Sequence, residues 1–180
     1  MTAEQRRKTL TLPKDRGEEL TDLQENEQGF RAPADLADAL QKVLIDFIAL
    51  QLVAKQAHWN VVGQNFRDLH LALDEVVNVA RIGTDTIAER MRALHVAPDG
   101  RPSVVAAQTG LKEFPAGEIS THQGIRLMVQ EIEATVKTMR EVHDTVDDSD
   151  PTSADILHGF IAQLEQHAWF LSSELRSPKS

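Results

Sequence analysis

The sequence predicts an all-α protein, a bundle of four helices with a long connection between the second and the third. Four stretches of the chain repeat their apolar residues at alternating steps of three and four, the spacing that places them on one face of a helix. Residues 95–119 interrupt this pattern with turn-forming residues, and only the apolar segment 104–107 indicates a short helix there. No stretch alternates convincingly as a β-strand does, so a sheet-based fold is not expected.

The first two helices are expected at residues 33–61 and 65–94. Pro33 stands in the first turn of the first helix, where its missing N–H group leaves no hydrogen bond unmade. Gly63 follows the end of that helix, as glycine commonly does. The turn between the two helices is short, so we expect them to pair antiparallel.

The third and fourth helices are expected at residues 120–146 and 151–175. Ser120, with Gln123 three residues later, has the spacing of a capping box at the start of the third helix. Asp150 precedes a proline and is expected to cap the fourth helix. Four helices with one long crossover form the ferritin-like arrangement, which is therefore the predicted fold.

Composition and charge divide the chain into a bundle and two tails. Residues 1–16 carry five bases and two acids, a net charge of +3, whereas residues 17–32 carry five acids and one base, a net charge of −4. Few large apolar residues occur in either stretch, so residues 1–32 are expected to be a mobile or loosely docked tail. The bundle is expected at 33–176 and a short C-terminal tail at 177–180.

Several classes of function are excluded by composition. The chain has no cysteine among its 180 residues, so disulfide scaffolds, thiol catalysis and zinc–thiolate sites are ruled out. A formal charge of −9 argues against a surface built as a whole to neutralise phosphates. No apolar run approaches the ~18–20 residues of a membrane span, and the first residues do not form a signal peptide. We expect a cytoplasmic protein with no membrane partner.

Five side chains of the first two helices form a candidate metal site. His58 lies six residues before Gln64 in the turn and His70 lies six after it, so the two imidazoles are expected at similar height. Asp74 follows His70 at i+4 on the same helix face, and Glu89 follows Asp85 in the same way. Imidazole and carboxylate ligands without sulfur suit Fe(II), Mn(II) or Zn(II), although acids at i,i+4 also occur on plain solvated faces.

The spacing along the second helix predicts that this site is shared between two subunits. Asp74 and Asp85 are separated by ~16 Å along the helix axis, too far for one metal site in one chain. Two copies of the helix that cross antiparallel near Ala80 would bring His70 and Asp74 of one chain against Asp85 and Glu89 of the other. The small residues Val79, Ala80 and Gly83 are expected to allow this close approach.

These motifs resemble those of the Dps family, the starvation-inducible DNA-binding proteins also called mini-ferritins. The family signature is His-Trp-Asn on the first helix, a His twelve residues later, an Asp four residues after that, and then Asp followed by Ala-Glu-Arg. The resemblance covers residues 33–175 and includes Asp-Ile-Leu at 155–157 and Trp-Phe at 169–170. The matching segments are KQAHWNVVG at 55–63, Phe66, Leu69-His70, Asp74-Glu75 and DTIAER at 85–90.

The resemblance implies a ferroxidase and iron store. Family members form hollow shells of twelve subunits, oxidise Fe(II) preferentially with hydrogen peroxide, and keep the ferric product inside, which limits oxidative damage. The family's ferroxidase ligands fall on His58, His70, Asp74, Asp85 and Glu89, so Fe(II)/Fe(III) is the implied metal. Trp59 resembles the family tryptophan beside the dinuclear site, with an ordinary buried aromatic as the alternative.

An acidic corner between the third and fourth helices has two interpretations. The stretch 141–155 holds six acids and no Lys or Arg. In the family, acids near this corner line pores that attract Fe(II), which would fall here on Asp147, Asp150 and Asp155. The alternative is a solvated turn whose acids favour the dipole of the following helix.

The remaining histidines have no metal-like partner at i+4. We expect His167 to be a hydrogen-bonded core residue because it lies on an apolar face. His95, His122, His143 and His158 are expected at the surface.

DNA binding is the alternative function. The candidate DNA contacts are the Lys and Arg residues of the N-terminal tail. The net charge of −9 opposes DNA binding by the rest of the chain. One hypothesis is therefore a nucleoid-associated DNA-binding protein with a secondary iron role, and another is a helical oligomer without metal, which the five matching ligands disfavour. The tail bases are Arg6, Arg7, Lys8, Lys14 and Arg16.

Overall fold

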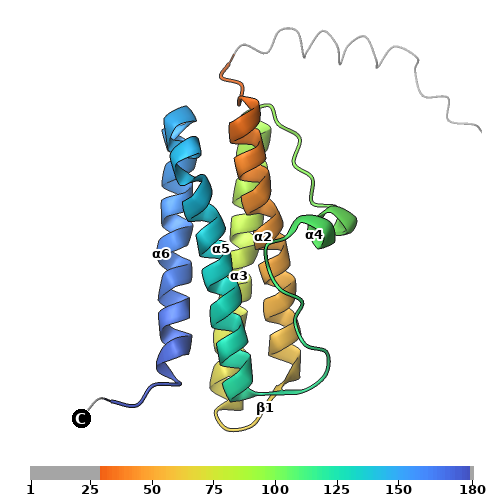
Figure 1. The fold of residues 1–180 in the computed structure, drawn as a ribbon, viewed down its shortest axis with the longest axis vertical. Coiled ribbons are helices and arrows are strands. Elements are labelled where there is room, and N and C mark those ends of the chain that lie inside the picture. Colours follow the sequence, from red (N-terminus) through yellow and green to blue (C-terminus); the bar gives the residue numbers. More distant parts are fainter. Residues whose placement is uncertain (1–28, 179–180) are drawn as a thin grey trace, which may run out of the picture. The chain divides into compact units, whose positions relative to one another are not determined.

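The computed structural model describes residues 29–178, and its compact unit begins at Arg31. Four long helices form the predicted bundle, and a shorter fifth helix lies in the connection (Figure 1). The long helices are α2 (Ala34–Asn60), α3 (Phe66–Ala93), α5 (Thr121–Ser149) and α6 (Pro151–Ser173), and the short one is α4 (Pro102–Gln108). The predicted all-α fold with a short helix between the second and third long helices is confirmed.

The long connection makes α3 and α5 run in the same direction. From the end of α3 the chain passes α4 beside α2 and returns along the bundle to the start of α5 (Figure 1). Asp46, which is 3% exposed, holds this connection against α2. Its carboxylate accepts hydrogen bonds from the Thr109 hydroxyl at 2.8 Å, the Gly110 N–H at 2.8 Å and the Thr138 hydroxyl at 2.7 Å.

A short parallel β-pair corrects the expectation that the chain has no strand. Strand β1 (Val61–Val62) follows α2 directly, and β2 (Ile119–Ser120) precedes α5, with Val61 opposite Ile119. Two residues are too few to show an alternating pattern, so this pairing is invisible in the sequence. It holds the start of α5 beside the end of α2.

The core lies between the four long helices and consists of side chains from their apolar stripes. Leu40, Phe47 and Leu50 of α2 are fully buried, as are Leu73 of α3 and Met139 of α5. The predicted cap of α5 is present, because the Ser120 hydroxyl accepts from the Gln123 N–H at 3.2 Å. Asp150 is the N-cap residue of α6 and Pro151 follows in the first turn, as expected, but the Asp150 side chain makes no capping hydrogen bond to that turn.

No helix in the range 29–178 is long and apolar enough to cross a membrane. The tail predicted for residues 1–32 lies almost wholly outside the described residues, as does half of the one predicted for 177–180. Both tail boundaries therefore stay predictions.

Candidate metal centre

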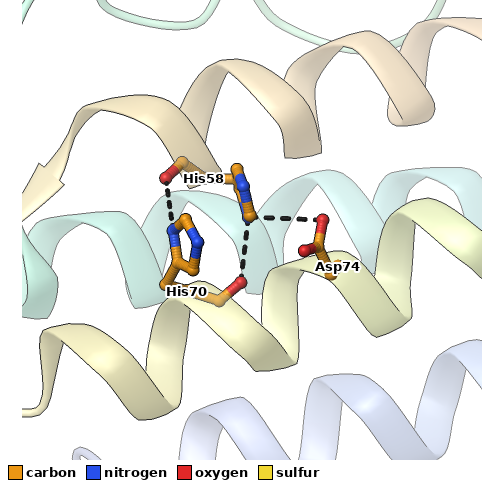
Figure 2. Close-up of side chains that lie close together, drawn as sticks. All are labelled: His58, His70 and Asp74. Atoms are coloured by element: carbon orange, nitrogen blue, oxygen red, sulfur yellow. Dashed lines mark hydrogen bonds and ion pairs between the residues drawn. The ribbon is translucent and has the colours of Figure 1, made fainter.

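Three of the five predicted ligands come together where α2 ends and α3 begins. His58 stands in the last turn of α2, and His70 and Asp74 follow on successive turns of α3 (Figure 2). One ligand atom from each lies within 4.8 Å of those from the other two. The antiparallel pairing of the two helices across their short turn produces this convergence, as the spacing around Gln64 predicts.

Each imidazole is oriented by a backbone carbonyl of the other histidine. His58 Nδ1 lies 2.9 Å from the His70 carbonyl oxygen, and His70 Nδ1 lies 3.0 Å from the His58 carbonyl oxygen (Figure 2). A carbonyl only accepts hydrogen bonds, so both Nδ1 atoms carry the proton in these contacts. In the neutral rings both Nε2 atoms are then left with a lone pair, which is the form that binds a metal.

The two rings are stacked, and their surroundings differ in exposure. The ring centroids lie 3.6 Å apart with planes inclined by 25°, and the ring of Phe66 flanks His70 at 5.2 Å. The His58 side chain is 8% exposed, whereas that of Asp74 is 45% exposed. The cluster therefore has a buried side formed by His58 and an open side at the Asp74 carboxylate.

The Asp74 carboxylate is held by a cation that sequence reasoning missed. Lys55 Nζ lies 2.5 Å from Asp74 Oδ1, and His58 Nδ1 lies 3.3 Å from the same oxygen. The hydrogen bond from Lys55 is the largest cause that lowers the pKa of Asp74 below its ordinary value, and the charges of the neighbouring bases lower it further. Lys55 precedes His58 by three residues, so the i+3 spacing on α2 could have revealed it.

The other two predicted ligands are not part of this cluster within one chain. Asp85 and Glu89 lie farther along α3, and both are exposed. Among the described residues, His58, His70 and Asp74 are the only group of three or more possible ligands whose ligand atoms lie close enough to share a metal ion. One chain thus brings three of the five predicted ligands together, and the other two lie farther along the same helix.

Large apolar side chains of α2 and α3 are exposed in the single chain. Trp59 is 69% exposed, so the alternative of a buried aromatic is wrong, and Leu52 is 61% and Ile82 51% exposed. Large apolar side chains that remain in water on a single chain commonly mark an interface.

The small residues of α3 do not lie where the sequence analysis placed them. Val79, Ala80 and Gly83 are buried within the chain. A Cβ at Gly83 would lie 2.6 Å from the ring of Phe47, so this glycine accommodates α2 of the same chain. The expectation that these residues admit a partner helix is wrong.

The predicted pore acids differ in what they contact. Asp147 and Asp155 are exposed. Asp150 is 8% exposed, and Oδ2 accepts from Arg90 Nη2 at 2.7 Å and from the Ser153 hydroxyl. Burial raises the pKa of Asp150, but the hydrogen bonds from Ser153 and Arg90 outweigh it and the net pKa is lowered. Asp150 is therefore engaged in joining α3 to α6, which corrects its assignment to a pore.

The remaining predicted positions have mixed outcomes. His167 is partly buried, with Nδ1 3.9 Å from Glu75 Oε2. His143 and His158 are paired with each other across α5 and α6, a contact that a search for partners on one helix could not find. The five tail bases that could contact DNA lie outside the described residues.

Comparison with known proteins identifies relatives over most of the chain. A family model described as a ferritin-like domain matches residues 37–179. The DNA protection during starvation protein of Agrobacterium fabrum is 30% identical over 152 residues, which cover 84% of this chain and 94% of that protein. The protein of the same description from Mycolicibacterium smegmatis is 29% identical over 80% of this chain and 79% of its own length.

A solved structure agrees with this relationship. The structure of Dps from Microbacterium arborescens in the high iron form superposes with a TM-score of 0.75 at 34% identity. The match covers 82% of this chain and 99% of that one.

Proposed function

The chain belongs to the Dps family of ferritin-like proteins, and we propose that it oxidises Fe(II) and stores the ferric product inside a shell of its own subunits. In this proposal hydrogen peroxide is the preferred oxidant. The reaction consumes Fe(II) and peroxide together, which protects the cell from the radicals that the two would otherwise form.

The convergence of His58, His70 and Asp74 is the observation that carries this proposal. Two imidazoles and one carboxylate are a donor set suited to Fe(II). Both imidazoles are already in the tautomer that ligation requires, because each Nδ1 is held by a carbonyl oxygen. Hydrogen bonds of this kind to the non-ligating nitrogen orient metal-binding histidines in general.

The site is complete in a two-fold dimer in this proposal. Asp85 and Glu89 of the partner subunit would supply further carboxylates. Within one chain these two residues lie on later turns of α3 and do not join the cluster of His58, His70 and Asp74. The exposed side chains of Leu52, Trp59 and Ile82 supply apolar surface for such an interface. An isologous contact forms the site twice, and the two-fold axis relates the two copies.

The residues then have distinct roles toward the substrate Fe(II). The imidazoles and carboxylates hold the ion in the position where it gives its electron to peroxide. Two Fe(II) ions supply the two electrons that one peroxide molecule takes up, and hydrolysis of the Fe(III) product releases protons to water. Lys55 stands beside Asp74, so its positive charge would oppose a metal bound to the same carboxylate oxygen.

Assembly and location follow from the family. We propose a twelve-subunit shell built from two-fold dimers, in the cytoplasm, with Asp147 and Asp155 as the remaining candidates for an iron-entry pore. The names of the two relatives describe DNA protection. These names support a second candidate function for this chain, that of a nucleoid-associated protein. In this alternative the basic residues of the N-terminal tail contact the DNA.

Replacing the two histidines tests the proposal. The change His58→Ala with His70→Ala is expected to slow Fe(II) oxidation by peroxide by ~100-fold or more, since loss of groups that only orient ligands already costs ~10–100-fold. His122→Ala removes an exposed histidine elsewhere and serves as the control. Wild-type kinetics in the double variant, with the helical content intact, would refute the site.

A further inference from the structure

A second pair of histidines lies at the other end of the bundle from the His58 cluster. His143 belongs to α5 and His158 to α6, near the turn that joins these two helices. The His58 cluster lies beside β1, at the opposite end of the bundle (Figure 1). The pair is therefore separate from the site described above.

The two imidazoles face each other through their Nε2 atoms. These nitrogens lie 2.6 Å apart, and the ring centroids lie 4.7 Å apart with planes inclined by 29°. His143 contributes a side chain that is 25% exposed, and that of His158 is 55% exposed. Both nitrogens are within reach of ions from solvent.

A carboxylate lies on the far side of each ring. His143 Nδ1 is 3.1 Å from Asp144 Oδ1, and His158 Nδ1 is 3.6 Å from Asp155 Oδ1. A carboxylate favours a proton on the nitrogen that faces it, so each neutral ring then presents the lone pair of Nε2 to the other ring. Two lone pairs repel at this distance, so in this tautomer a cation between the two nitrogens stabilises the pair.

We propose that His143 and His158 form a binding site for a divalent transition-metal ion of the Zn(II) class. A carboxylate on the non-ligating nitrogen is the arrangement that orients metal-binding histidines. With Zn–N bonds of about 2.0–2.1 Å and a tetrahedral angle, the two nitrogens would lie about 3.3 Å apart. A small rotation of the exposed His158 ring provides this opening, and the other coordination positions remain for water.

The charges around the pair favour a cation. Asp144 and Asp155 bring negative charge to both rings. Arg140 lines the same surface pocket, but its guanidinium is bound to the Glu165 carboxylate at 2.5 Å, which offsets its charge. Because the ligands come from two helices, the bound ion joins α5 to α6.

Zinc titration of the assembled, chelator-treated protein tests this site. His143→Ala with His158→Ala is expected to abolish one Zn(II) equivalent per chain in a calorimetric titration, and to leave Fe(II) oxidation unchanged. His58→Ala with His70→Ala is expected to retain that equivalent, and His122→Ala serves as the control for removal of an exposed histidine. Asp155→Asn is expected to retain the site with ~10-fold weaker binding, because it removes only the orienting group.

Anomalous diffraction at the zinc edge completes the test. A peak between the two Nε2 atoms is expected in zinc-soaked crystals of the unchanged chain. An undiminished zinc stoichiometry in the His143/His158 double variant, or no peak at the pair, would overturn the proposal and leave a shared proton as the cation. These outcomes do not depend on whether the His58 cluster oxidises iron.

Discussion

Lys55 is predicted to weaken metal binding at the His58 cluster, and its removal should strengthen it. Its ammonium lies 2.5 Å from Asp74 Oδ1. A metal bound to that oxygen at 2.0–2.2 Å would lie at most about 4.7 Å from Nζ. In water, the repulsion between a unit charge and a divalent ion at this distance is about 1.8 kcal/mol. Screening at physiological salt reduces it to about 1 kcal/mol.

The change Lys55→Met removes the charge and keeps most of the side-chain volume. About 1 kcal/mol corresponds to ~5-fold tighter binding of Fe(II) or Zn(II), and the gain should grow at low salt. Anaerobic Fe(II) titration at two salt concentrations measures it, with Lys137→Met as the control because Lys137 is an exposed lysine paired with Glu141. Weaker binding in the Lys55 variant would refute this reasoning and show that the ammonium supports the site.

Three further predictions concern stability and DNA. Asp46→Ala leaves two donors of the connection, Thr109 and Gly110, and the Thr138 hydroxyl of α5 without their acceptor. It is expected to cost about 3–5 kcal/mol in urea unfolding, whereas Asp46→Asn should cost less. Asp150 has a lowered native pKa, so its contribution to stability is complete above the unfolded value near 3.9 and is lost as the pH falls through the native value. Arg90→Gln is expected to flatten this part of the stability profile, and an unchanged acid transition would contradict the assignment. DNA binding, where gel shifts detect it, is expected to need residues 1–16 and to weaken with salt at a log–log slope of about −0.9 per phosphate neutralised, so binding that survives their deletion contradicts the tail mechanism.

The helices and the three-residue cluster of the site could be predicted because both depend on local periodicity. Apolar residues at steps of three and four define the buried face of each long helix, and the i+4 spacing places His70 and Asp74 together. The symmetry of His58 and His70 about the turn is also readable, because a short turn leaves little choice of helix pairing. These inferences need no knowledge of what the rest of the chain contacts.

The features that the sequence analysis missed depend on contacts between distant segments. The β-pair, the Asp46 contacts and the His143–His158 pair all join residues that no single helix brings together. Asp150 is engaged by Arg90 of another helix, and Gly83 accommodates Phe47 of α2 rather than a partner subunit. The spacing of a residue along the sequence shows which face of its helix it occupies. Which residue of another segment packs against that face is known only from the tertiary structure.

Subunit mixing tests the shared site most directly. One chain carries His70→Ala with Asp74→Asn, the other carries Asp85→Asn with Glu89→Gln, and neither forms an intact site alone. Each mixed two-fold dimer contains one intact site of two, so random equimolar mixing should restore about one quarter of the wild-type rate of Fe(II) oxidation. A mixture that stays as inactive as its parents after confirmed subunit exchange would contradict the shared site.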